Sequence, residues 1–320
     1  MTAKNQEVTF YTIGDKRYFL GVVTLLNSLR LTNNYSDLVV LDCGLTPTQR
    51  ELLAPHCKLV EISNEQASNP TLFKPFPSQL HPTGIVALID SDMIVTGLLA
   101  EIINLASIGK ICVFPDPESD RWFAEWQQLF DLPNAPRHQI YANAGFVVFS
   151  TSHWSNLLEK WWQACQRILS HPTLAEGAAN TEPSAQADQD ALNALLMSEI
   201  PAHALAFQPP EEEVYRENLY EFELVDVQTL ECKYCDRPTM ILHSNGSPKP
   251  WNPQSWRLVR RRDANMRLLM HRLLTGEDIT LKVPVNMLPF WLRPGIAAQI
   301  SIYGLYAANP LISAIRKSYL

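Results

Sequence analysis

The feature that most restricts the fold is the alternation of short apolar runs with helical patterns along the first third of the chain. Strands are predicted at residues 7–13, 38–41, 58–62 and 85–89, and helices at about 19–29 and 47–54. The run Ile85–Ile89 is apolar throughout, as expected of a strand that is covered on both faces. Repeated strand–helix–strand units predict an α/β fold with a mainly parallel, Rossmann-like central sheet and helices on both faces.

The second part of the chain is less regular. Strands are expected at 111–114, 146–149 and 240–243, helices at 151–169 and 190–197, and a loop at 171–187. Because there is no internal repeat and no long linker, we expect one domain of catalytic size over residues 1–255. A helical C-terminal extension, residues 256–320, is expected to follow it.

Composition excludes several classes of protein. With 46% hydrophobic and 18% charged residues, the chain is neither disordered nor fibrous. It lacks an apolar run long enough to span a bilayer, and its first residues lack the pattern of a secretory signal. The six cysteines are too sparse for a disulfide framework, and we expect Cys232 and Cys235 to be free thiols in a loop rather than a zinc site. A cytoplasmic protein is therefore expected.

Charge is distributed unevenly along the chain. The net charge is −7, but residues 251–320 carry +7 and the first 250 residues carry −14. An acidic body argues against a nucleic-acid partner. The basic segment 257–267 precedes an apolar segment, 284–315, that prolines interrupt. The extension could dock peripherally on anionic lipid, or it could pack on the body or in a dimer interface.

The sharpest chemical signal is the D-x-D triplet Asp90, Ser91 and Asp92, directly after the apolar strand 85–89. Two carboxylates spaced by one residue in an extended segment point the same way, at the strand end where α/β folds bind ligands. Such hard oxygen ligands suit Mg²⁺ or Mn²⁺. The other interpretation is an acidic turn without a metal.

Three later segments complete a pattern. They are the N-A-G at 143–145, the D-Q-D at 188–190 and the H-x-x-G-x-x-K-P-W at 243–251, and earlier positions of the same pattern are Asp15, Tyr18, Gly21, Ser28 and the run 40–45. In this order, from about residue 8 to 251, the sequence resembles the family-eight retaining glycosyltransferases, which include glycogenin and the bacterial lipopolysaccharide galactosyltransferases.

The resemblance implies a GT-A fold, a nucleotide-sugar donor that is usually a UDP-sugar, and a divalent ion, Mn²⁺ or Mg²⁺. By the family pattern, Asp90, Asp92 and His243 hold the metal, which stabilises the negative charge of a departing diphosphate. The residues implied at the nucleotide and the sugar are Thr12, Asp15, Tyr18, Lys74, Ser91, Asn143, Gly145, Gly246 and Lys249, with Asp188 and Gln189 beside the reacting carbon. Around Lys74 the sequence departs from the commoner Tyr-x-Arg form of the family.

Several of these residues also have a purely structural interpretation. Asp15 and Asp188 could cap helices, and Tyr18 could belong to the core. Retention is implied by the family alone: Asp188 and Asp190 are the candidate nucleophiles, and a front-face path needs neither. Trp122, Phe123 and Trp126 could stack on an acceptor sugar or fill the core. The acidic run 211–213 is expected to be a solvated face.

The sequence therefore favours a metal-dependent glycosyltransferase that moves a hexose from a UDP-sugar to a hydroxyl of an unidentified glycan, lipid or protein acceptor. The alternative is a non-catalytic GT-A protein that binds a sugar nucleotide or a glycan. A nucleotidyltransferase is less favoured, because the turn after the first strand contains a single glycine, Gly14, and no glycine-rich phosphate loop.

Overall fold

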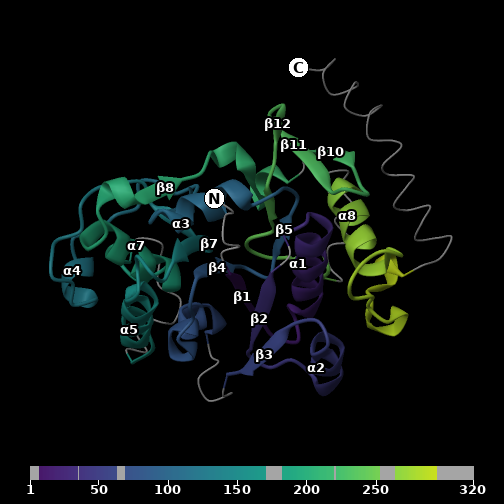
Figure 1. The fold of residues 1–320 in the computed structure, drawn as a ribbon, viewed down its shortest axis with the longest axis horizontal. Helices are drawn as coiled ribbons and strands as arrows, with labels where there is room; N and C mark the ends of the chain where they lie inside the picture. The colour runs from purple at the N-terminus through teal and green to yellow at the C-terminus, as the bar shows by residue number, and fades with distance from the viewer. Residues whose placement is uncertain are drawn as a thin grey trace, which may run out of the picture.

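The computed structural model describes residues 7–34, 36–62, 69–170, 182–219, 221–252 and 264–293. Its centre is a seven-stranded sheet with the strand order β3-β2-β1-β4-β7-β6-β8 (Figure 1). The strands are β1 (Val8–Gly14), β2 (Asp37–Asp42), β3 (Lys58–Glu61), β4 (Ile85–Ile89), β6 (Ile111–Pro115), β7 (Ala142–Ser150) and β8 (Leu205–Phe207).

The strands predicted in the first third of the chain are confirmed, and all four run parallel: β1 pairs with β2 and β4, and β2 pairs with β3. β7 is antiparallel to both of its neighbours, β4 and β6. The sheet is therefore mainly parallel with one reversed strand, and β7 begins at the edge where β1, β4 and β6 end.

Helices cover both faces of the sheet, as predicted. On one face lie α1 (Phe19–Leu31), α2 (Pro47–Leu53), α3 (Ala100–Ser107) and α8 (Ala264–Thr275); on the other lie α4 (Trp126–Leu129), α5 (Leu157–Ser170) and α7 (Asp188–Ser198). Alternate residues of β4 divide between the two cores, with Ala87 in the first and Leu88 in the second. This explains why the strand is apolar throughout.

Two small sheets stand beside the central one. The first contains β5 (Met93–Val95), β13 (Ile241–His243) and β9 (Glu213–Tyr215), and the second contains β10 (Glu223–Asp226), β11 (Glu231–Tyr234) and β12 (Arg237–Pro238). Short 3-10 helices are η1 (Pro70–Phe73), η2 (Phe76–Leu80), η3 (Ala202–Ala204), η4 (Pro210–Glu212), η5 (Arg216–Asn218), η8 (Val285–Met287) and η9 (Phe290–Leu292). The strand expected at 240–243 thus belongs to a satellite sheet.

The described part of the C-terminal extension packs on the body. α8 lies beside α1 (Figure 1), and its leucines belong to the same core as α1. Arg267 and Arg272, two of the basic residues, are buried, and Arg272 pairs with Asp278 at 2.7 Å. Residues 264–293 therefore pack on the body, which was one of the interpretations of the extension. Residues 253–263 and 294–320 lie outside the described residues. None of the helices described is long and apolar enough to cross a membrane.

A buried amide joins this extension to the body. The Asn27 side chain in α1 donates to the carbonyls of Leu273 and Leu281, at 2.7 and 2.8 Å, and accepts from the Leu281 amide at 3.0 Å. Asn27 is fully buried. The side chain therefore satisfies backbone groups that would otherwise be buried without partners.

We expect Asn27→Ala to lower the free energy of unfolding by about 1–3 kcal/mol, because it leaves buried backbone groups unpaired. Urea denaturation followed by circular dichroism measures this. Asn104→Ala, at an exposed position of α3, is the control and should change stability by less than about 0.5 kcal/mol. Equal midpoints for the two variants would contradict the role of Asn27.

Candidate active site

A cavity of about 540 Å³ lies at the edge of the sheet where β1, β4 and β6 end and β7 begins. The residues predicted for the site line it with one exception; they are Asp15, Tyr18, Lys74, Asp90, Ser91, Asp92, Asn143, Gly145, Asp188, Gln189, His243, Gly246 and Lys249. The exception, Thr12, is buried in β1 and is 2% exposed. The topology therefore gathers residues from six separate segments of the chain.

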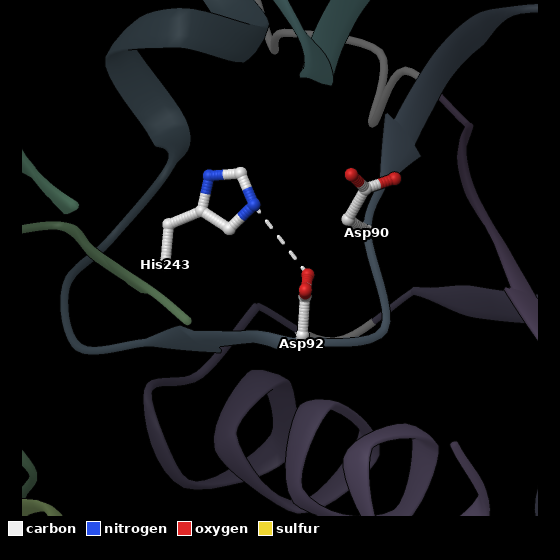
Figure 2. Close-up of side chains that lie close together, drawn as sticks. All are labelled: Asp90, Asp92 and His243. Carbon is white, nitrogen blue, oxygen red and sulfur yellow. Dashed lines mark ion pairs between the residues drawn. The ribbon is translucent and has the colours of Figure 1, made fainter. Parts of the chain in front are cut away.

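Asp90, Asp92 and His243 converge in this cavity (Figure 2). Each offers a ligand atom, and these atoms lie within 4.8 Å of one another. The strand pairing explains the proximity: β5 follows Asp92 directly and runs antiparallel to β13, with Met93 opposite His243. The Ser244 amide also donates to the Asp92 carbonyl at 3.0 Å. Two carboxylates and an imidazole are a donor set that Mn²⁺ accepts.

Two lysines neutralise the carboxylates. Lys249 pairs with Asp92 and donates to the Ser244 carbonyl at 2.8 Å, while Lys74 lies 3.0 Å from Asp90 and 2.9 Å from Asp188. Burial alone would lower the pKa of Lys74, but the Asp188 and Asp90 carboxylates outweigh it and raise the pKa. Burial likewise works against ionised Asp92, yet contacts with His243 and Lys249 hold its pKa well below the usual range. Lys74 is therefore held as a cation, and both lysines line the cavity.

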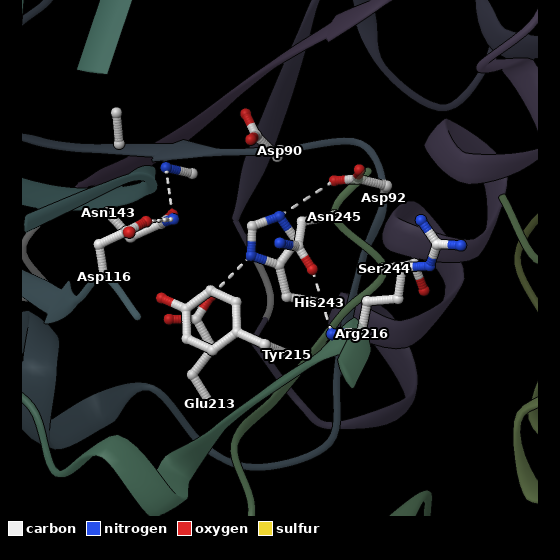
Figure 3. A network of polar contacts seen from close by, with 12 residues as sticks. Asp90, Asp92, Asp116, Asn143, Glu213, Tyr215, Arg216, His243, Ser244 and Asn245 are labelled. Carbon is white, nitrogen blue, oxygen red and sulfur yellow. Dashed lines mark hydrogen bonds and ion pairs between the residues drawn. The ribbon is translucent and has the colours of Figure 1, made fainter. Parts of the chain in front are cut away.

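His243 is held between two acids (Figure 3). Its Nδ1 lies 2.8 Å from Glu213 Oε1, and its Nε2 lies 3.5 Å from Asp92 Oδ1. Although burial opposes the charged ring, these carboxylates raise the pKa of His243 to about 10. The prediction of a solvated acidic run is wrong for Glu213, which is 2% exposed because β9 places it against β13.

Asp116, which follows β6, was missed by the sequence analysis. Its Oδ2 accepts a hydrogen bond from the side-chain amide of Asn143 (Figure 3) and another from that of Gln189, both at 3.0 Å. Gln189 also accepts from the Ala144 amide at 2.9 Å. Asp116 thus fixes two predicted sugar-binding amides at the wall of the cavity. Asp116 follows a strand at the same edge of the sheet as Asp90. This position after an apolar strand could have identified it from the sequence.

The two aspartates of the D-Q-D have different environments. Asp188 faces the cavity and Lys74, and burial raises its pKa. Asp190 is fully buried and accepts two hydrogen bonds from Arg121 and one from Tyr141, each at 2.7 Å. Asp190 therefore has a structural role, and Asp188 is the one that can reach a ligand.

At the other wall, the turn before α1 carries Asp15 and Tyr18. Asp15 Oδ1 accepts from the amides of Arg17 and Tyr18, at 2.7 and 3.0 Å, and so closes the turn before the helix. The N-cap of α1 is Tyr18 and no side chain caps it, so the helix-capping interpretation of Asp15 is wrong. The Tyr18 ring lies 5.3 Å from Lys249 Nζ and edge-on to Trp251. Both Asp15 and Tyr18 nevertheless line the cavity.

Two glycines matter at the site. A Cβ on Gly145 would lie 2.9 Å from Asp90 Oδ2 and 2.7 Å from Asn143 Oδ1, so this position has no room for a side chain. Gly246 has a φ of +70°, which favours glycine, and it packs beside Arg216 in the loop that leads to Lys249.

The remaining sequence candidates lie away from the cavity. Trp126 is fully buried, Trp122 stacks on His138 at 3.9 Å, and Phe123 packs beneath Arg121, so they have packing roles. Cys232 is buried in β11, so the expectation of a loop is wrong for this residue; Cys235 is exposed, and all six cysteines are unpaired. Within the described ranges, the cluster of acidic and histidine side chains that could hold a metal ion is the one formed by Asp90, Asp92 and His243.

Comparison with known proteins establishes the fold. No protein-family model matches the chain, and no curated protein matches it by sequence. Among solved structures, the galactosyltransferase LgtC in complex with donor and acceptor sugar analogues is 14% identical, with a TM-score of 0.57 over 87% of this chain and 98% of that one. An active-site mutant of LgtC gives a TM-score of 0.56.

A second solved structure agrees. The bifunctional glycosyltransferase WbbM is 19% identical, with a TM-score of 0.54 over 84% of this chain, which spans 50% of the WbbM chain. These likenesses confirm the predicted GT-A fold.

We expect Asp190→Asn to lower the free energy of unfolding by about 3–5 kcal/mol, because it breaks a buried ion pair and leaves Arg121 without its carboxylate. The matched change Asp131→Asn breaks an exposed pair with Arg167 and should cost at most about 1 kcal/mol. Urea midpoints compare the two variants. A similar small loss in both would contradict the structural role of Asp190.

Proposed function

We propose that the protein is a retaining glycosyltransferase that moves a hexose from a UDP-sugar to an acceptor hydroxyl with the help of Mn²⁺ or Mg²⁺. The observation that carries the proposal is the convergence of Asp90, Asp92, His243 and Lys249 in one cavity of a GT-A fold. The likeness to LgtC, which was solved with donor and acceptor sugar analogues, supports it.

The donor set fits a divalent metal. Asp90, Asp92 and His243 would hold the ion, which stabilises the negative charge of a leaving diphosphate when it is bound. Lys249 adds a second positive charge in the same cavity, on a loop that Gly246 allows to approach a phosphate closely. Electrostatic stabilisation of this kind is worth several kcal/mol when it acts on charge that develops in the transition state.

The opposite wall would bind the sugar. Asn143, Gln189 and Asp188 line it, and their amide and carboxylate groups match the hydroxyls of a hexose. The ammonium group of Lys74 pairs with both Asp188 and Asp90. The regions proposed for the sugar and for the metal therefore share one positive charge. Asp15, Tyr18 and Ser91 also line the cavity and would bind the nucleoside, whereas Thr12 is buried in β1 outside the lining.

Two paths to retention remain compatible with these residues. In a double displacement, Asp188 would be the nucleophile, since Asp190 is occupied by Arg121 and Tyr141. In a front-face path, the leaving phosphate accepts the proton of the acceptor hydroxyl, and Asp188 and Gln189 position the sugar.

The decisive experiment is hydrolysis of a panel of UDP-sugars by the purified protein with and without Mn²⁺. We expect one donor to be cleaved in a Mn²⁺-dependent manner, and Asp92→Asn to reduce that rate at least 100-fold because it removes a metal ligand. Asp37→Asn, at an exposed position of β2, is the control and should retain the full rate.

Thermal shift with UDP separates the two candidate functions. UDP should stabilise the unaltered chain only when Mn²⁺ is present, and it should not stabilise a folded Asp92→Asn variant. Stabilisation by UDP without hydrolysis of any donor would favour the non-catalytic alternative. Unchanged stabilisation of the variant would contradict the metal assignment.

We also propose peripheral contact with anionic lipid through the C-terminal extension. The segment from Lys282 to Arg293 exposes both of these basic side chains together with the apolar Val285 and Phe290. Vesicles containing anionic lipid should therefore bind the protein at low salt and release it at high salt, because salt screens exposed charge. Co-sedimentation measures this, and equal binding to neutral vesicles would contradict the electrostatic part.

A further inference from the structure

Glu213 is a buried acid next to a residue assigned to the metal. We propose that Glu213 is a positioning residue: it accepts the Nδ1 proton of His243 and so presents Nε2 to a divalent cation. This inference rests on the metal site of the proposed function, and it assigns a role to a residue outside the ligand set. Figure 3 shows Glu213 on the side of the His243 ring opposite Asp92.

The strand register places the two side chains together. β9 runs parallel to β13, with Glu213 beside Ile241 and Tyr215 beside His243. Residues two apart on a strand point to the same face, so the side chains of Glu213 and His243 share one face of this small sheet. The contact of 2.8 Å between Glu213 Oε1 and His243 Nδ1 follows from that arrangement.

Tyr215, on the same strand as Glu213, limits movement of the His243 ring. Its ring lies 5.5 Å from that of His243, and its hydroxyl donates to the Pro115 carbonyl at 3.0 Å, which ties β9 to the end of β6. With Glu213 on Nδ1 and Tyr215 against the ring, the orientation of His243 is set before any ligand binds.

The chemistry requires an acceptor at Nδ1. A neutral imidazole that binds a metal through one nitrogen carries its proton on the other, and a carboxylate at that proton fixes the tautomer and makes the ligand more basic. Glu213 is 2% exposed, and its other oxygen, Oε2, has no hydrogen-bond partner in the described part of the chain. Burying a carboxylate costs free energy unless it is paired, and the contact of 2.8 Å with the His243 ring supplies such a partner.

The local charge explains why the acceptor is an acid. Lys74 and Lys249 pair with the two ligating carboxylates, and both cations weaken the attraction for a divalent ion. Glu213 adds negative charge close to the site without occupying a coordination position. A neutral glutamine of the same size keeps the shape and removes this charge.

Binding of Mn²⁺ alone tests the proposal, measured from the electron paramagnetic resonance signal of the free ion. We expect Glu213→Gln to weaken Mn²⁺ binding about 10–100-fold. Glu212→Gln makes the same chemical change one residue earlier, on η4, where the side chain is only partly buried, and should leave the affinity within about twofold. Circular dichroism of both variants monitors the fold.

The outcomes separate the two proposals. A folded Glu213→Gln variant with unaltered Mn²⁺ affinity overturns the role of Glu213 and leaves the metal site standing. Failure of the unaltered chain to bind Mn²⁺ overturns the metal site, and the role of Glu213 with it.

A second measurement applies if the Gln variant does not fold. In the unaltered chain loaded with Zn²⁺ as a diamagnetic probe, ¹⁵N-histidine spectra should show His243 protonated at Nδ1 and metallated at Nε2. The reverse assignment overturns the proposal.

Discussion

The pairing of β5 with β13 is the contact on which the site depends. It joins segments about 150 residues apart and puts His243 opposite Met93, so that the imidazole lies across from the carboxylates that follow β4. Without this pairing, Asp90 and Asp92 would be an acidic turn at a strand end. The central sheet supplies one half of the site, and the satellite sheet β5-β13-β9 brings the other half to it.

The charged side chains of the cavity are paired with side chains of opposite charge. Asp90, Asp92 and Asp188 are balanced by Lys74 and Lys249, and Glu213 is balanced by His243. Desolvation opposes the charges of Lys74, Asp92 and His243, and the contacts of these three groups outweigh it. Such an arrangement holds several ionised groups in place before a charged ligand arrives, which lowers the reorganisation that binding requires.

The parallel sheet and the D-x-D could be predicted from local sequence patterns, whereas most of the other cavity residues were implied by the family resemblance. Apolar runs mark buried strands, and polar residues that follow them mark the ligand-binding edge; Asp90 and Asp92 were found in this way. Asp188, which begins α7, was implied by the family resemblance. Asp116 follows a buried strand too, but a single acid carries less signal than a D-x-D. Glu213 was assigned to the surface because its acidic neighbours suggested a solvated run, whereas burial in a three-residue strand is decided by which strands pair with it. That pairing is non-local and cannot be deduced from the run itself.

The contact between α1 and α8 has a consequence for biosynthesis. α1 is buried along nearly its whole length, and part of its cover is supplied by residues more than 230 positions later, including the backbone groups that Asn27 binds. A nascent chain therefore emerges from the ribosome with this helix incompletely covered, and it stays so through most of translation. Folding of this core is completed late, and until then the apolar face of α1 is a natural binding site for chaperones.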